Sequence, residues 1–179
     1  MKRTLLISLI FAAFCNFSAL GNNFSTGQGG ISDVAPTFEK GDFVINVGIG
    51  FGRAPLGSTG IPPVSVSGEY GLIQDLFTEN LHLGIGGILG IQTYTTTHFL
   101  HGSETHLSLS FLARAAVHYP LVDDFDVHAG LVTGFRTNPN RMIVGTYIGG
   151  RYYLNESFAL MAEVGYGITY INLGVAFKF

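Results

Sequence analysis

The last eight residues, Asn172 to Phe179, constrain the fold of this 179-residue chain more than any other segment. Their side chains alternate strictly between apolar and small or polar types, which is the period of a β-strand, where successive side chains point to opposite faces. One face of this strand carries four apolar side chains, namely Leu173, Val175, Phe177 and Phe179. No helix-forming segment accompanies the strand to cover that face, so the pattern predicts a strand that borders lipid.

The first 21 residues have the pattern of a secretory signal peptide. Lys2 and Arg3 give a positively charged start, an apolar run extends from Leu5 to Phe14, and Ala19 to Gly21 forms a small-x-small cleavage site. The apolar run is too short to span a bilayer as a helix. We therefore expect cleavage after residue 21, a flexible periplasmic lead-in at residues 22–39 and a folded domain at residues 40–179.

Composition excludes several classes for the exported part. Cys15, the single cysteine, falls in the signal peptide, so neither disulfides nor thiolate metal sites are expected. Without Lys2 and Arg3, twelve acidic residues face seven basic ones, a balance unsuited to binding nucleic acid. Apolar residues make up 47% of the chain and charged residues only 12%, with 25 glycines, which disfavours both disorder and a helical bundle. An all-β fold remains.

Eight alternating segments separated by short polar turns predict eight strands. We place them at residues 42–52, 63–73, 80–94, 105–120, 125–137, 141–154, 157–167 and 169–179. Most are long enough to cross a bilayer at a tilt, which takes about nine to eleven residues. The sequence therefore predicts an eight-stranded antiparallel up-and-down transmembrane β-barrel with short loops.

The two faces of the strands separate a membrane barrel from a water-soluble one. Within residues 106–118, one face carries only Leu, Phe, Ala and Val, while the other mixes Ser, His and Arg with Leu and Ala. A lipocalin-like soluble barrel would place its apolar face inside, and its outer face would carry many charged side chains in contact with water. Here the second face carries mostly small side chains and few charges, as a narrow enclosed lumen requires. We therefore expect the apolar face to point outward.

The C-terminal segment resembles the insertion signal of bacterial outer-membrane barrels at Asn172, Gly174, Phe177 and Phe179. With the signal peptide and the eight strands, this gives residues 40–179 a resemblance to small outer-membrane barrels of the OmpX and OmpA transmembrane-domain type. The resemblance implies a location in the cell outer membrane, with the barrel-assembly machinery as a partner during insertion. Members of this type serve as envelope structure, adhesins or immune-evasion proteins, usually through long outer loops. The resemblance implies a fold more firmly than a function.

Charged side chains are expected inside the barrel. By alternation, Glu69, Arg114, Arg151 and Glu163 point inward, and an eight-stranded barrel is only wide enough for side chains to fill. Because an unpaired charge in that space would be strongly destabilising, we expect the two glutamates to neutralise the two arginines as a polar plug. A selective ion or proton path is the alternative interpretation of the same residues.

Enzyme and metal sites are weighed as alternatives. His106, Ser108 and Glu104 loosely resemble the His-x-Ser pair and acidic partner of a barrel-shaped lipid A deacylase, but Leu109 stands where that family has Asn. The histidines at positions 98, 101 and 106 fall in or beside a loop without fixed geometry, so no metal site is expected there. The sequence thus predicts no catalytic residue, no metal and no cofactor.

The uneven distribution of charge suggests a lipid contact. Arg53, Arg136 and Arg141 lie at the predicted outer rim, which would face the anionic phosphates of lipopolysaccharide, and we expect Arg53 and Arg141 to contact them. The predicted function is a non-enzymatic outer-membrane barrel with an envelope structural or surface-interaction role and an unknown surface ligand. A narrow channel for small or hydrophobic solutes and a lipid A-modifying enzyme are the alternatives.

Overall fold

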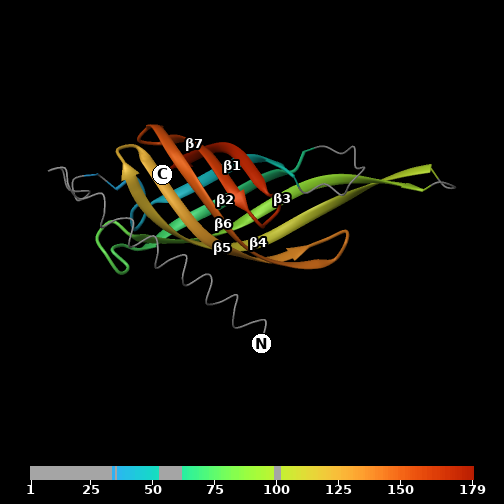
Figure 1. The fold of residues 1–179 in the computed structure, drawn as a ribbon, viewed down its shortest axis with the longest axis horizontal. Coiled ribbons are helices and arrows are strands. Elements are labelled where there is room, and N and C mark those ends of the chain that lie inside the picture. The colour runs from blue at the N-terminus through green and yellow to red at the C-terminus, as the bar shows by residue number, and fades with distance from the viewer. Residues whose placement is uncertain (1–33, 35, 53–61, 99–101) are drawn as a thin grey trace, which may run out of the picture. The chain divides into compact units, whose positions relative to one another are not determined.

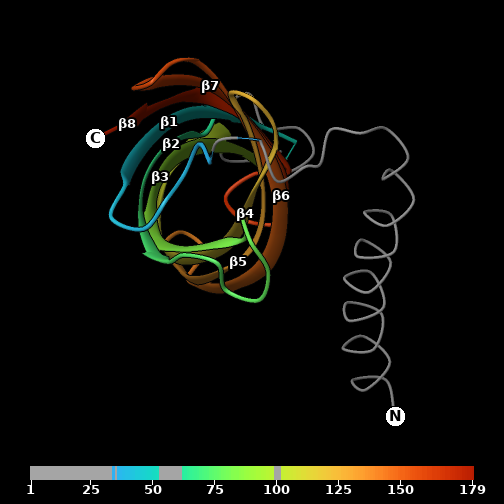
Figure 2. The same ribbon diagram turned by 90° about the vertical axis from the view of Figure 1, so that its left-hand side faces the viewer.

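Eight antiparallel strands form a closed barrel, in which each strand pairs with its neighbours in sequence and β8 pairs with β1 (Figure 1, Figure 2). The computed structural model describes residue 34 and residues 36–52, 62–98 and 102–179. The strands are β1 (Phe43–Phe51), β2 (Val64–Ile73), β3 (His82–His98), β4 (Gly102–Val122), β5 (Phe125–Arg136), β6 (Arg141–Asn155), β7 (Phe158–Gly165) and β8 (Ile171–Lys178). This barrel confirms the predicted fold class.

The barrel belongs to a unit that spans Val34–Phe179. The predicted signal peptide at residues 1–21 and most of the lead-in at residues 22–39 lie outside the described residues. Among the residues that are described, no helix is long and apolar enough to cross a membrane.

Alternation along each strand places one set of side chains in the lumen and the other on the outer surface. Much of the outward set is apolar and well exposed, and the members that are 39% exposed or more include Val47, Ile49, Ile85, Leu89, Leu131, Ile148, Val164 and Leu173. A continuous apolar surface of this extent is far larger than the patches that water-soluble monomers expose. It suits a lipid environment, as predicted from the sequence.

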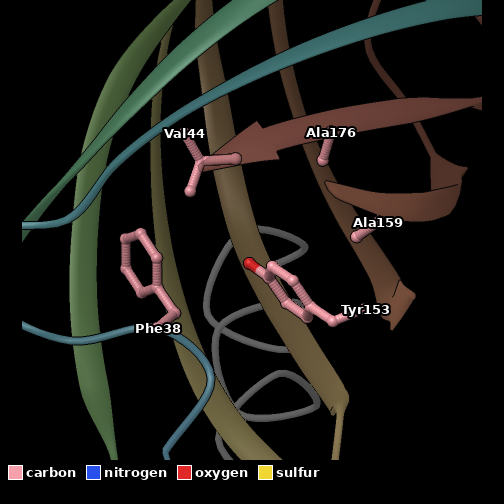
Figure 3. Close-up of a cluster of buried hydrophobic side chains, with 5 residues drawn as sticks. All are labelled: Phe38, Val44, Tyr153, Ala159 and Ala176. Atoms are coloured by element: carbon pink, nitrogen blue, oxygen red, sulfur yellow. The ribbon is translucent and has the colours of Figure 1, made fainter. Parts of the chain in front are cut away.

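One end of the lumen, where β1 begins and β8 ends, is closed by the segment that precedes β1. We call this the terminal end. Phe38 is 1% exposed and lies in a cluster with Val44, Tyr153, Ala159 and Ala176 (Figure 3). Backbone hydrogen bonds between Gly71 and residues 41 and 42 fix the segment against β2. A Cβ on Gly71 would lie 1.9 Å from the carbonyl oxygen of Glu39, so this close approach requires glycine. Residues 36–39, predicted to be flexible, therefore pack against the barrel.

The lumen toward the opposite end, here called the loop end, holds a second cluster of apolar side chains. Leu112, Val132, Ile143 and Ile168 form a buried cluster, against which Tyr147 and Tyr166 pack. Ile168 lies between β7 and β8, at the single residue that separates the two predicted strands. Arg136 holds this segment inward, because its Nη2 donates to the carbonyl oxygen of Ile168 at 3.0 Å.

The β3–β4 hairpin extends well beyond its neighbours at the loop end (Figure 1). The pairing of β2 with β3 stops at Val64 and Ile91, whereas β3 and β4 remain paired from Gln92 and Ser108 to His98 and Gly102. At about 3.4 Å per residue, this ladder is on the order of 20 Å long. The sequence predicted a loop at residues 95–104, so most of that loop is strand.

Candidate functional site

The lumen holds a buried network of polar side chains from six strands. Its members are Asn46 of β1, Ser67 and Glu69 of β2, Arg114 and His118 of β4, Asp126 and His128 of β5, Arg151 of β6 and Glu163 of β7. We call these residues the lumen network. Each side chain points inward because it shares the alternation of its strand, and each residue is at most 8% exposed. Charges at this depth require partners, because desolvation is costly.

Both arginines of the network are held by carboxylates. Arg114 Nη2 lies 2.9 Å from Glu163 Oε1 and 3.7 Å from Glu69 Oε2. Arg151 donates from Nη2 to Glu69 Oε2 and from Nε to Asn46 Oδ1, the latter at 3.2 Å. The guanidinium carbon of Arg114 also lies 4.6 Å from the centre of the Tyr147 ring. Glu69 therefore bridges the two cations.

His118 links two carboxylates of the network. Its Nδ1 lies 2.9 Å from Asp126 Oδ2, and its Nε2 lies 3.0 Å from Glu69 Oε1. An ionised carboxylate only accepts hydrogen bonds, so a doubly protonated His118 is the form that donates to both. In that form the three carboxylates are matched by two guanidiniums and one imidazolium, and the network is electrically neutral.

Three lumen histidines lie side by side on adjacent strands. His82 is the register partner of His118, which in turn is the register partner of His128. His128 Nε2 lies 3.1 Å from Glu163 Oε1, while its Nδ1 makes no hydrogen bond to any described residue and lies 3.5 Å from Asp126 Oδ2. His82 is 1% exposed, and neither of its ring nitrogens has a hydrogen-bond partner among the described residues.

The four residues predicted as a polar plug lie together in this network. Glu69, Arg114, Arg151 and Glu163 are all buried and joined by the contacts above. The predicted set omitted Asp126, which is 1% exposed and contacts both His118 and His128. Its signal was present in the sequence, since Asp126 is two residues from His128 and therefore on the same face of β5.

The residues of the predicted insertion signal lie along the seam between β1 and β8. Asn172 accepts from Ser65 Oγ at 3.4 Å, and a Cβ added to Gly174 would lie 2.1 Å from the carbonyl oxygen of Val47. The Phe177 ring packs against Phe158 at a tilt of 52°, with ring centres 5.3 Å apart. Phe179 is 74% exposed, while its backbone exchanges two hydrogen bonds with Phe43.

The predicted rim arginines differ in position. Arg53 lies outside the described residues, and Arg141 is exposed at the start of β6. Arg136 is only 6% exposed and bonds to Ser110 and Ile168 inside the barrel, so the sequence placed it wrongly at the rim. Alternation alone could have placed Arg136 in the lumen.

The residues considered for lipid A chemistry do not form a free nucleophile and base. His106 Nε2 lies 3.8 Å from Glu104 Oε2, and both side chains are exposed. Ser108 is 0% exposed, and its hydroxyl donates to the carbonyl oxygen of Thr137 at 2.6 Å. The hydroxyl is therefore buried and already bonded.

No family model and no curated protein matches this chain. Among solved structures, a de novo designed transmembrane β-barrel is similar over 79% of this chain and 98% of its own, with 16% identity and a TM-score of 0.52. The chain has the fold of a transmembrane β-barrel. The resemblance predicted from the sequence is thus confirmed at the level of the fold. The *Yersinia pestis* outer membrane protein Ail is similar over 78% of this chain and 100% of its own, with 12% identity and a TM-score of 0.48.

Proposed function

We propose that this chain is a non-enzymatic barrel of the outer membrane that acts as a surface-interaction protein through the β3–β4 hairpin. The observation that supports this role is the projection of the hairpin at the loop end, where β3 and β4 stay paired as far as His98 and Gly102. With the terminal end in the periplasm, the hairpin stands outside the cell. Lipopolysaccharide surrounds the barrel, and the barrel-assembly machinery inserts it.

The composition of the hairpin suits contact with a partner. Its segment from Gln92 to His98 contains four threonines and a tyrosine. A paired ladder is already ordered, so binding through it costs less conformational entropy than binding through a mobile loop. The Thr95 and Thr105 hydroxyl groups lie 3.1 Å apart across the two strands and help to hold them in register. An extended ladder of this kind presents side chains in a fixed pattern to a second surface.

The contents of the lumen argue against the two alternatives. The lumen network lies between the apolar cluster of the terminal end and that of the loop end, an arrangement unsuited to a channel. The buried Ser108 hydroxyl, bonded to Thr137, is unsuited to attack on a lipid.

Trimming the hairpin tests the proposed role. A variant in which residues 94–106 are replaced by Asn-Gly keeps the barrel strands and removes the projecting ladder. It would be expressed in a deletion strain beside the parent and beside a variant with the order of residues 93–98 and 102–107 scrambled. We expect the trimmed variant to fold, to preserve resistance to bile salts and to lose attachment to cultured cells and autoaggregation.

The outcomes separate the two parts of the proposal. Attachment and autoaggregation equal to those of the parent, in a trimmed barrel that is present at the surface, would contradict a role for the hairpin. Loss of bile-salt resistance in the deletion strain and in the trimmed strain alike would assign the hairpin to envelope structure instead. The scrambled variant shows whether the side-chain pattern or the ladder itself makes the contact.

A further inference from the structure

We propose that the lumen holds a binding site for a divalent transition metal, with zinc as the best fit, formed by His118, Asp126 and His128. One ligand atom from each of these residues lies within 4.8 Å of the other two, and all three residues are at most 2% exposed. Two imidazole nitrogens and one carboxylate oxygen are a common protein ligand set for zinc, with a fourth position open. The inference is independent of the proposed role of the hairpin.

The ligand atoms have nearly the spacing that a tetrahedral ion requires. His118 Nδ1 lies 2.9 Å and His128 Nδ1 lies 3.5 Å from Asp126 Oδ2. Zinc binds nitrogen and oxygen at about 2.0 to 2.1 Å, which sets neighbouring tetrahedral ligands roughly 3.3 Å apart. The two distances to Asp126 Oδ2 are therefore close to this spacing, and the three ligand atoms, which lie within 4.8 Å of one another, would draw closer around a bound ion.

The opposite nitrogens of both histidines support the same assignment. His118 Nε2 bonds to Glu69 at 3.0 Å, and His128 Nε2 bonds to Glu163 at 3.1 Å. Metal-ligating histidines usually donate their second N–H to a carboxylate, which fixes the tautomer and orients the ring. Here both rings are oriented so that their Nδ1 atoms converge on Asp126. Of the four ring nitrogens of His118 and His128, His128 Nδ1 is the one that has no hydrogen-bond partner among the described residues.

The charge balance of the lumen network indicates the fourth ligand of the bound ion. Binding displaces the proton from His118 Nδ1 to solvent, after which three carboxylates face two guanidiniums and one divalent ion. The excess is one positive charge, which a monovalent anion such as chloride or hydroxide would neutralise as the fourth ligand. A like charge beside the site is Arg151, whose Nη1 lies 3.7 Å from Asp126 Oδ2, and Glu69 binds the other side of that guanidinium.

Metal loading during refolding tests the site, because its three ligand residues are buried in the folded barrel. The parent protein would be refolded into detergent with Zn²⁺ or Co²⁺, separated from free ions and analysed for bound metal. We expect one ion per folded chain, and visible absorption bands of tetrahedral Co²⁺ for the cobalt form. Zinc should also raise the thermal unfolding midpoint relative to protein refolded with a chelator.

Variants separate this site from binding elsewhere. His128→Gln and Asp126→Asn should lose more than about 100-fold in affinity, and Glu163→Gln about 10- to 100-fold, as expected for a residue that orients a ligand. His106→Gln, which changes an exposed histidine on the same strand, should bind like the parent. Each variant is scored only in its heat-modifiable, folded form, so a failure to fold is not mistaken for a loss of binding.

Two results would overturn the proposal. One is a folded parent barrel that retains no zinc or cobalt after refolding with either ion. The other is retention of a full equivalent by His128→Gln and Asp126→Asn together with its loss in His106→Gln, which would place the metal in the hairpin.

Discussion

Glu69 is the residue on which most charges of the lumen depend, since it contacts Arg114, Arg151 and His118. Changing both Glu69 and Glu163 to Gln removes the carboxylates that hold the two buried guanidiniums. Breaking a buried pair in this way costs about 3 to 5 kcal/mol. We therefore expect a clearly lower urea midpoint for unfolding in detergent.

The matched control for this double variant is Glu156→Gln. Glu156 is exposed in the turn between β6 and β7, so its neutralisation should leave the midpoint unchanged. A double variant that unfolds at the same urea concentration as the parent would show that the two glutamates are not needed to neutralise the arginines.

Arg141, which is exposed at the loop end, and Arg53, which lies outside the described residues, lead to a prediction about lipid. If Arg53 and Arg141 contact lipopolysaccharide phosphates, each exposed pair contributes about 1 kcal/mol or less. Changing both to Gln should weaken binding of lipopolysaccharide to the reconstituted barrel in low salt, with a difference that shrinks as salt is added. Changing Lys40, exposed near the terminal end, is the control. Equal binding by the variant and the parent at every salt concentration would leave these arginines as solvated charge.

At the scale of the strands, the seam between β1 and β8 depends on close backbone contact. Gly174 faces Gly48 in the register, and a Cβ at Gly174 would lie 2.1 Å from a backbone oxygen of β1. Gly174→Ala should therefore destabilise the folded barrel by about 1 to 3 kcal/mol, the usual cost of overpacking. Gly87→Ala is the control, because the nearest atom to its added Cβ lies 3.6 Å away. Equal unfolding midpoints for the two variants would mean that β1 and β8 can move apart to fit the added methyl group without a loss of stability.

The last aromatic of the chain gives a prediction about assembly rather than stability. Phe179 is 74% exposed, so its side chain adds little to packing in the folded barrel. We expect Phe179→Ala to reduce the amount of heat-modifiable barrel in the outer membrane while export to the periplasm continues. Phe77→Ala, at an exposed phenylalanine between β2 and β3, should assemble normally. Normal assembly of Phe179→Ala would reject Phe179 as part of an insertion signal.

The strands were predictable from the sequence where only one face borders lipid, and they were not where both faces border water. A shift of one residue in a lipid-facing strand turns its whole apolar set inward, so the alternation fixes which side chains enter the lumen. Gln92 to His98 lack such alternation, because the projecting ladder has no apolar side, and the prediction ended β3 too early. The inward positions of Phe38 and Ile168 depend on packing between distant segments, which no local pattern records.

At the scale of the whole barrel, the filled lumen leads to a prediction about conductance. The apolar cluster around Phe38, the lumen network and the cluster around Ile168 occupy successive parts of the interior. The purified protein in planar bilayers should therefore show no stable open pore and at most rare, small events. Phe38→Ala should behave in the same way, because it leaves the lumen network and the apolar cluster around Ile168 in place. Large, steady, ion-selective currents from the parent would favour the channel alternative.

The pairing of β1 with β8 determines when the barrel can finish folding. The two strands are the first and last of the ring to be synthesised, so no partly made chain can satisfy both edges. Until Ile45 meets Phe177, every intermediate carries two open edges that can pair with other chains. The entropy of closing so long a loop makes this meeting slow. The passage of the unclosed chain through water is therefore its most aggregation-prone stage, and a chaperone that shields those edges would do more for the yield than any gain in the stability of the finished ring.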